Sequence, residues 1–239
     1  MSSVAFIEPS LQSRGDGSFG VALDGKPLKT PAGTEIAVAS KRLAEAMVDE
    51  WRNVVPRGKA PKINFSKLPL TRIVGTAIDR VPPKRDALLD ELIAYAQTEL
   101  LCFRASEPAA LVEREAAIWQ PLLDWAALTF DAPLVVSHGS IIAPEQPAQS
   151  LAALRAAMAA MDDLKLAGLG VAVAATSSLV VSLALAEGKI DAVGAFEAAE
   201  LDATFQIERW GEDSEATEKR AKTRQELIVA ERFFALARS

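Results

Sequence analysis

The chain has 239 residues, 50% of them hydrophobic and 24% charged, so it is long and apolar enough to bury the core of one or two domains. Its formal net charge of −6 argues against a protein that coats phosphate backbones. The single cysteine, Cys102, excludes an internal disulfide and a multi-thiolate metal site and favours a reducing compartment. The opening MSSVAFIEPS has the pattern of neither a signal peptide nor a transit peptide, so we expect a cytoplasmic protein.

Residues 19–39 predict a small β-meander. Short β-prone runs alternate there with Asp24-Gly25 and with Pro31-Ala32-Gly33. Both stretches suit tight turns between strands, because glycine accepts a positive φ.

A helix is expected to follow, with Ser40 as its N-terminal cap. Leu43, Met47 and Trp51 recur every four residues, which places them on one helical face. We therefore expect the Trp51 indole on the apolar stripe that packs against the sheet.

Helical periodicity dominates the rest of the chain, in keeping with its many alanines, which favour helix. We predict an α+β fold with two domains. Residues 1–66 form a small N-terminal α+β domain with the β-meander, and residues 67–239 form a larger all-α domain.

Residues 167–186 carry no charge and are long enough to cross a bilayer. Twelve of the twenty are Ala, Gly, Ser or Thr, so membrane insertion would gain little free energy. A helix that is apolar on all sides can also form the centre of a helical bundle. We predict one buried helix that ends at Gly188, with no stable membrane insertion, and keep a membrane-associated assembly factor as the alternative.

No sequence motif points to catalysis, a cofactor or a metal. His138 lies between two serines, but no GxSxG turn is present and no third group can be named to orient the imidazole. Gly168 and Gly170 lack the third glycine of a dinucleotide-binding turn. We expect a protein that is not an enzyme. The alternative, a carboxylate-based enzyme, requires two acids that converge in an enclosed pocket.

Charge is segregated along the sequence. Between Arg52 and Arg85 there are nine basic residues and one acid, whereas between Glu197 and Glu218 there are eight acids and one base. These runs are either solvated or mutually facing helix surfaces, or one of them steers a charged protein partner. Aromatic residues for base stacking are few in the basic run, so we expect no nucleic-acid partner.

The stretch FQIERWGEDS at 205–214 predicts a corner between two helices. The first helix should end at Gly211, and Asp213 or Ser214 should cap the next. We expect Phe205 and Trp210 to pack toward the bundle, which leaves the acids of this stretch as a candidate docking edge.

Seven segments in the same order resemble the ATP synthase assembly chaperones of the Atp-twelve (ATP12) family. They are LDGKPLKTPAG at 23–33, the pair Glu50-Trp51, PLTRIVGTAIDRV at 69–81, TELLCFRA at 98–105, WQPLLDWA at 119–126, SLVVSLALAEGKID at 178–191 and FQIERWGED at 205–213. The resemblance implies a bacterial, non-enzymatic chaperone with a C-terminal orthogonal helical bundle. It also implies binding to the unassembled alpha subunit of the F-type ATP synthase, whose interface is shielded until the beta subunit replaces the chaperone.

The same resemblance implies functional importance for the tryptophan at position 51 and for an acid just ahead of the Phe-Gln-Ile string. Asp202 aligns best with that acid, and Glu200 and Glu208 are near alternatives. We expect a chain that is monomeric when free, with no cofactor. The candidate partner-binding residues are Trp51, Glu200, Asp202, Glu208, Trp210 and Glu212.

Overall fold

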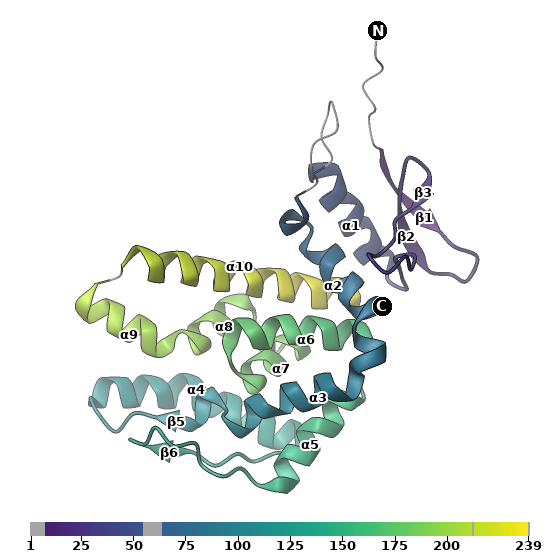
Figure 1. Cartoon of the computed structure of the whole chain (residues 1–239). Coiled ribbons are helices and arrows are strands. Elements are labelled where there is room, and N and C mark those ends of the chain that lie inside the picture. Colours follow the sequence, from purple (N-terminus) through teal and green to yellow (C-terminus); the bar gives the residue numbers. More distant parts are fainter. Residues whose placement is uncertain (1–7, 55–63, 212, 239) are drawn as a thin grey trace. The chain divides into compact units, whose positions relative to one another are not determined.

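The computed structural model describes residues 8–54, 64–211 and 213–238 (Figure 1). The chain separates into two compact units. Unit 1 comprises Met1–Lys84, Asp163–Ala167 and Arg232–Ser239, and unit 2 comprises Arg85–Asp162 and Gly168–Glu231. Strands are concentrated near the N-terminus and helices make up most of the remainder, which confirms the predicted α+β fold class.

Unit 1 contains a four-stranded antiparallel sheet in which β2 pairs with each of the other strands. The strands are β1 (Pro9–Ser13), β2 (Phe19–Leu23), β3 (Lys26–Pro27) and β4 (Ala37–Val38). Asp24 and Gly25 connect β2 to β3 with φ values of 50° and 74°. Positive φ at both positions is the geometry of a tight hairpin turn, so the predicted turn is confirmed.

Helix α1 (Lys41–Val54) packs on β1 and β2. The Ser40 hydroxyl accepts a hydrogen bond from the Leu43 amide at 3.2 Å, as predicted for the N-terminal cap. Leu43, Met47 and Trp51 are all buried, so the apolar stripe inferred from their spacing is the core face of α1.

A buried glutamate of α1 caps the next α-helix. The Glu50 carboxylate accepts hydrogen bonds from the amides of Leu70 and Thr71, at 2.7 and 3.0 Å, and from the Thr71 hydroxyl at 2.9 Å. These donors belong to the first turn of α2 (Pro69–Asp79), which follows the short 3-10 helix η1 (Phe65–Lys67). Because the first amides of a helix have no partner within it, Glu50 satisfies donors that α2 cannot.

Unit 2 is built mainly of helices, and three of them, α3, α6 and α10, have residues in both units. The elements after α2 are α3 (Val81–Gln97), η2 (Leu100–Cys102), β5 (Phe103–Arg104), α4 (Ala109–Phe130), β6 (Ser137–His138), α5 (Ala148–Ala159), α6 (Asp163–Thr176), α7 (Leu179–Glu187), α8 (Ala192–Ala199), α9 (Leu201–Trp210) and α10 (Ser214–Ala237). Strands β5 and β6 form a parallel pair.

The uncharged stretch 167–186 is divided between α6 and α7, so the prediction of one continuous helix is wrong. Ser177 adopts a left-handed φ of 55°, and the hydroxyl of Ser178 accepts from the Val181 amide at 3.0 Å to start α7. Every residue of α7 from Leu179 to Ala186 is buried, and α7 ends at Gly188 with a φ of 74°, as predicted. No helix among the described residues has both the length and the hydropathy of a bilayer span.

A second buried glutamate caps α7. Glu99 is fully buried, and its carboxylate accepts hydrogen bonds from the Leu179 and Val180 amides at 3.0 and 3.1 Å and from the Ser178 hydroxyl. Burial nonetheless raises the pKa of Glu99 to about 7, because desolvation disfavours the charged form more than these donors favour it. The polar start of α7 is thereby satisfied inside an otherwise apolar core.

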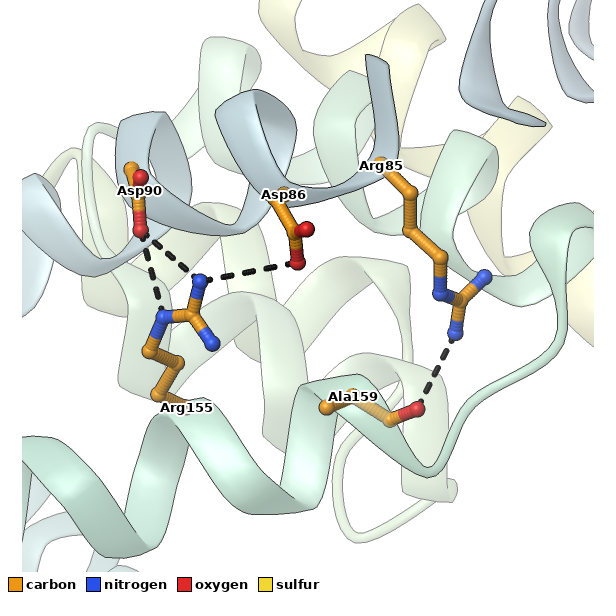
Figure 2. A network of polar contacts seen from close by, with 5 residues as sticks. All are labelled: Arg85, Asp86, Asp90, Arg155 and Ala159. Atoms are coloured by element: carbon orange, nitrogen blue, oxygen red, sulfur yellow. Dashed lines mark hydrogen bonds and ion pairs between the residues drawn. The ribbon is translucent and has the colours of Figure 1, made fainter. Parts of the chain in front are cut away.

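Exposed ion pairs connect α3 to α5 (Figure 2). The Arg155 guanidinium lies 3.0 Å from the Asp90 carboxylate and 3.8 Å from that of Asp86. Arg85 donates to the carbonyl of Ala159 at 3.1 Å, at the C-terminal end of α5, where a cation complements the helix dipole. Arg85, the last of the nine basic residues in the run from Arg52, therefore makes this contact within unit 2.

Candidate functional site

The acidic segment 197–218 forms the helix corner predicted from the sequence. Helix α9 ends at Gly211, which has a φ of 83°. The Asp213 carboxylate then accepts from the Ala216 amide at 2.7 Å and caps α10. Figure 1 shows α9 and α10 meeting at this corner.

The two aromatic residues of α9 have opposite environments. Phe205 is buried, and the Arg209 guanidinium lies 4.2 Å from the centre of its ring. Trp210 is 76% exposed, so the prediction that it packs toward the bundle is wrong. Five residues of α-helix rotate a side chain by about 140° from its starting direction. Phe205 and Trp210 therefore cannot both face the core, and α9 presents the indole to solvent.

Glu200 forms an ion pair with a helix that follows later in the chain. Its carboxylate lies 2.9 Å from the guanidinium of Arg220 on α10, and both side chains are largely buried. Arg220 also donates to the hydroxyl of Thr204 on α9, at 2.9 Å. Glu200 therefore helps to fix α9 against α10.

Glu208 forms an ion pair in the other direction, toward α4. The Arg114 guanidinium lies 2.9 to 3.0 Å from the Glu208 carboxylate. The hydrogen bond from Arg114 lowers the pKa of Glu208, since it favours the charged form. The negative charge of Glu208 is thus balanced by a residue 94 positions earlier in the sequence.

Asp202 lies near an acid of α4, Glu115. The two carboxyl groups are close enough for the Asp202 charge to act on Glu115, and the Glu115 carboxylate accepts from the Ala105 amide at 2.9 Å. Burial raises the pKa of Asp202 and raises that of Glu115 to about 6. The Asp202 Oδ1 atom is buried with no hydrogen-bond partner in the described part of the chain. Asp202 is thus a half-buried acid rather than a freely exposed charge.

A groove of about 350 Å³ lies between α9 and α10. Trp210 and Ile207 form much of its apolar wall, while Glu200, Asp213, Lys219 and Arg220 supply charges of both signs. Asp202 and Glu115 do not line it. The Asp202 and Glu115 carboxyl groups therefore lie outside the groove. The large apolar side chain that α9 exposes to solvent is Trp210, and charged residues line the groove beside it.

The remaining candidates lie elsewhere. Trp51 belongs to unit 1, where it is only 2% exposed, and Glu212 lies outside the described residues. Among the residues that are described, no three His, Cys, Asp or Glu side chains are grouped to hold a metal ion. Sequence reasoning missed Glu115, Arg114 and Arg220, because no local pattern links these residues to α9.

Comparisons with known proteins agree with the fold and extend over nearly the whole chain. The family model for the ATP12 chaperone protein matches residues 5–127. A mitochondrial protein named atp12 from Schizosaccharomyces pombe is 26% identical over 217 residues, which cover 85% of this chain and 72% of that protein.

Two solved bacterial structures are also similar. The crystal structure of Atp12 from Paracoccus denitrificans superposes with a TM-score of 0.88 at 36% identity, covering 97% of this chain and 96% of that one. A protein from Agrobacterium tumefaciens superposes with a TM-score of 0.87 at 32% identity, covering 97% of this chain and 85% of that one. On this evidence, the chain belongs to the ATP12 chaperone protein family.

Proposed function

We propose that this ATP12-family chaperone for ATP synthase assembly binds the unassembled alpha subunit of the catalytic head. Binding covers the apolar interface of the alpha subunit until the beta subunit displaces the chaperone. A chaperone of this kind lowers the free concentration of the aggregation-prone subunit by mass action and needs no catalytic residues.

The observation that carries the proposed docking surface is the exposed Trp210 beside the α9–α10 groove. Tryptophan is enriched among the residues that dominate binding energy, especially where a polar rim surrounds it. Ile207 extends the apolar wall, and Lys219 and Asp213 contribute charges of both signs at its edge. A small apolar anchor with a charged rim suits an interface that forms quickly and that a competitor can displace.

The acids of α9 have a supporting role in this proposal. Asp202 and Glu208 are engaged with α4, and Glu200 is engaged with α10. These contacts fix the direction in which α9 presents Trp210. Substitution of these acids is expected to weaken binding by displacing the helix, whereas Glu212 remains a candidate for direct contact.

Capture of purified alpha subunit on the immobilised chaperone tests the proposal. Trp210→Ala should reduce capture at least about tenfold, the usual effect of removing a dominant aromatic anchor. Its thermal midpoint should match that of the unaltered protein, since the removed side chain is exposed. The matched control is Leu128→Ala, because Leu128 on α4 is 88% exposed and does not line the groove.

The capture results for the unaltered protein and for Trp210→Ala test two different claims, the proposed function and the proposed docking surface. No capture by the unaltered protein, under conditions where the alpha subunit stays folded and unassembled, would overturn the proposed function. Normal capture by Trp210→Ala would instead retain the function and reject the α9–α10 groove as the docking surface.

A further inference from the structure

Unit 1 contains a second groove, of about 440 Å³, which the residues of α9 do not reach. Its walls come from the chain around β3, from α1 and from α2. Leu28, Ile36 and Phe65 contribute apolar surface, and Phe65 is itself exposed. The groove therefore combines an accessible apolar wall with polar groups that come mainly from α2.

A buried indole lies at this groove. Trp51 lines it and is almost fully buried, yet the indole Nε1 has no hydrogen-bond partner among the described residues. A buried polar group left unpaired costs about 1 to 3 kcal/mol. The Nε1 atom is itself closed to solvent, so an occupant of the groove does not meet it directly.

One face of α2 supplies positive charge. The groove is lined by Arg72, Gly75, Thr76 and Asp79 of α2 and by Arg80 at its C-terminal cap, at spacings of three and four residues that bring them to one side of the helix. Within the described ranges, neither Arg72 nor Arg80 has an ion-pair partner, whereas Asp79 accepts from the Thr30 hydroxyl at 2.9 Å. The two guanidinium groups are therefore available to an acidic occupant.

Gly75 lies between the two arginines and leaves the middle of this face open. A methyl group added at Gly75 would meet no atom within 4 Å. The eight steps from Arg72 to Arg80 rise by about 12 Å along the helix. A β-strand covers the same distance in about four residues, and side chains four positions apart on a strand point to the same side.

We propose that this groove binds an extended, acidic peptide segment of the captured protein. Two acids four positions apart pair with Arg72 and Arg80, and an apolar side chain midway between them packs over Gly75. The inference rests on the proposed function only for the origin of the segment, because its chemistry is set by the groove.

Nuclear magnetic resonance of the full chain tests the proposal directly. The probe is the capped peptide Gly-Glu-Ser-Leu-Ser-Glu-Gly, and the signal is the indole N–H of Trp51, which is assigned by its loss in Trp51→Phe. Adding the peptide should shift that signal, because Trp51 lines the groove that the peptide fills. The same peptide with glutamine in place of both glutamates should bind at least about tenfold more weakly, since hydrogen bonds to charged groups are the stronger class.

Two pairs of variants separate a specific site from general charge attraction. Gly75→Leu should abolish the shift by filling the groove, while Gly170→Leu, on α6, should preserve it, because Gly170 is likewise helical with open space at its Cβ position. Arg72→Glu with Arg80→Glu should abolish binding. The control is Lys26→Glu with Arg42→Glu, which makes the same charge change at exposed positions outside the groove.

The proposal is overturned if the indole signal does not move at saturating peptide, if the glutamine peptide binds equally well, or if inorganic phosphate produces the same shift. Loss of alpha-subunit capture in Gly75→Leu, with capture retained in Gly170→Leu, would identify the captured protein as the source of the segment. Peptide binding that persists when the unaltered protein fails to capture the alpha subunit would reject the proposed function and keep the groove.

Discussion

Replacing Glu99 by glutamine should flatten the pH dependence of stability between about pH 4.5 and pH 7. Glu99 is fully buried at the start of α7, and burial raises its pKa to about 7 from an ordinary value of 4.5. Glutamine has nearly the same shape but does not titrate. The variant therefore removes this one proton-linked contribution while keeping an oxygen that can accept from the α7 amides.

The sign and the size of the effect follow from the two pKa values. Between them, the folded protein holds the Glu99 proton while the unfolded chain releases it, so rising pH favours unfolding. The difference between a pKa of about 7 and one of 4.5 corresponds to about 3 kcal/mol. The unaltered protein should lose on the order of 3 kcal/mol more stability than Glu99→Gln as the pH rises through this window.

Urea unfolding followed by circular dichroism, repeated at half-unit steps from pH 4.5 to pH 8, measures this difference. For each protein, the free energy of unfolding is plotted against pH. Comparing the slopes of the two plots removes any constant destabilisation caused by the amide itself. Glu113→Gln serves as the control, since Glu113 is an exposed glutamate of α4 and its replacement also removes one formal charge. Parallel pH profiles for the unaltered protein and Glu99→Gln would refute the reasoning.

Two further predictions concern side chains with and without partners. Trp119→Phe should cost about 1 to 3 kcal/mol more in urea unfolding than Trp51→Phe, because the Trp119 indole donates to the Ala198 carbonyl at 2.8 Å while the Trp51 N–H has no acceptor among the described residues. Equal losses would contradict this account of Trp51. Arg220→Met leaves the largely buried Glu200 carboxylate without its cation, so amide hydrogen exchange in α9 should accelerate about tenfold or more, and unchanged protection would show that the pair does not fix this helix.

Features fixed by short-range geometry could be predicted from the sequence. The Asp24-Gly25 turn, the Ser40 cap and the end of α7 at Gly188 each depend on a residue and its nearest neighbours. The corner between α9 and α10 depends in the same way on Gly211 and Asp213. Local sequence therefore contained enough information to place these boundaries.

Features that join distant parts of the chain could not be predicted. Glu50 and Glu99 are ordinary helical or loop acids by sequence, and only the tertiary fold brings them to the starts of α2 and α7. The charge count of the acidic run likewise omitted Arg114 and Arg220, which balance Glu208 and Glu200 from other segments. Glu200 and Glu208 are therefore interpreted as residues that hold α9 in place. The exposed Trp210 indole beside them is the principal candidate for partner binding.

The position of Glu99 in the chain has a consequence for synthesis. The carboxylate that satisfies the start of α7 lies 80 residues before Leu179, so it has already been translated when the uncharged stretch leaves the ribosome. The first amides of α7 therefore find their acceptors in Ser178 and Glu99, and they need no segment that is translated later. A chain that lacked Glu99 would present the same apolar segment without that acceptor for the Leu179 and Val180 amides.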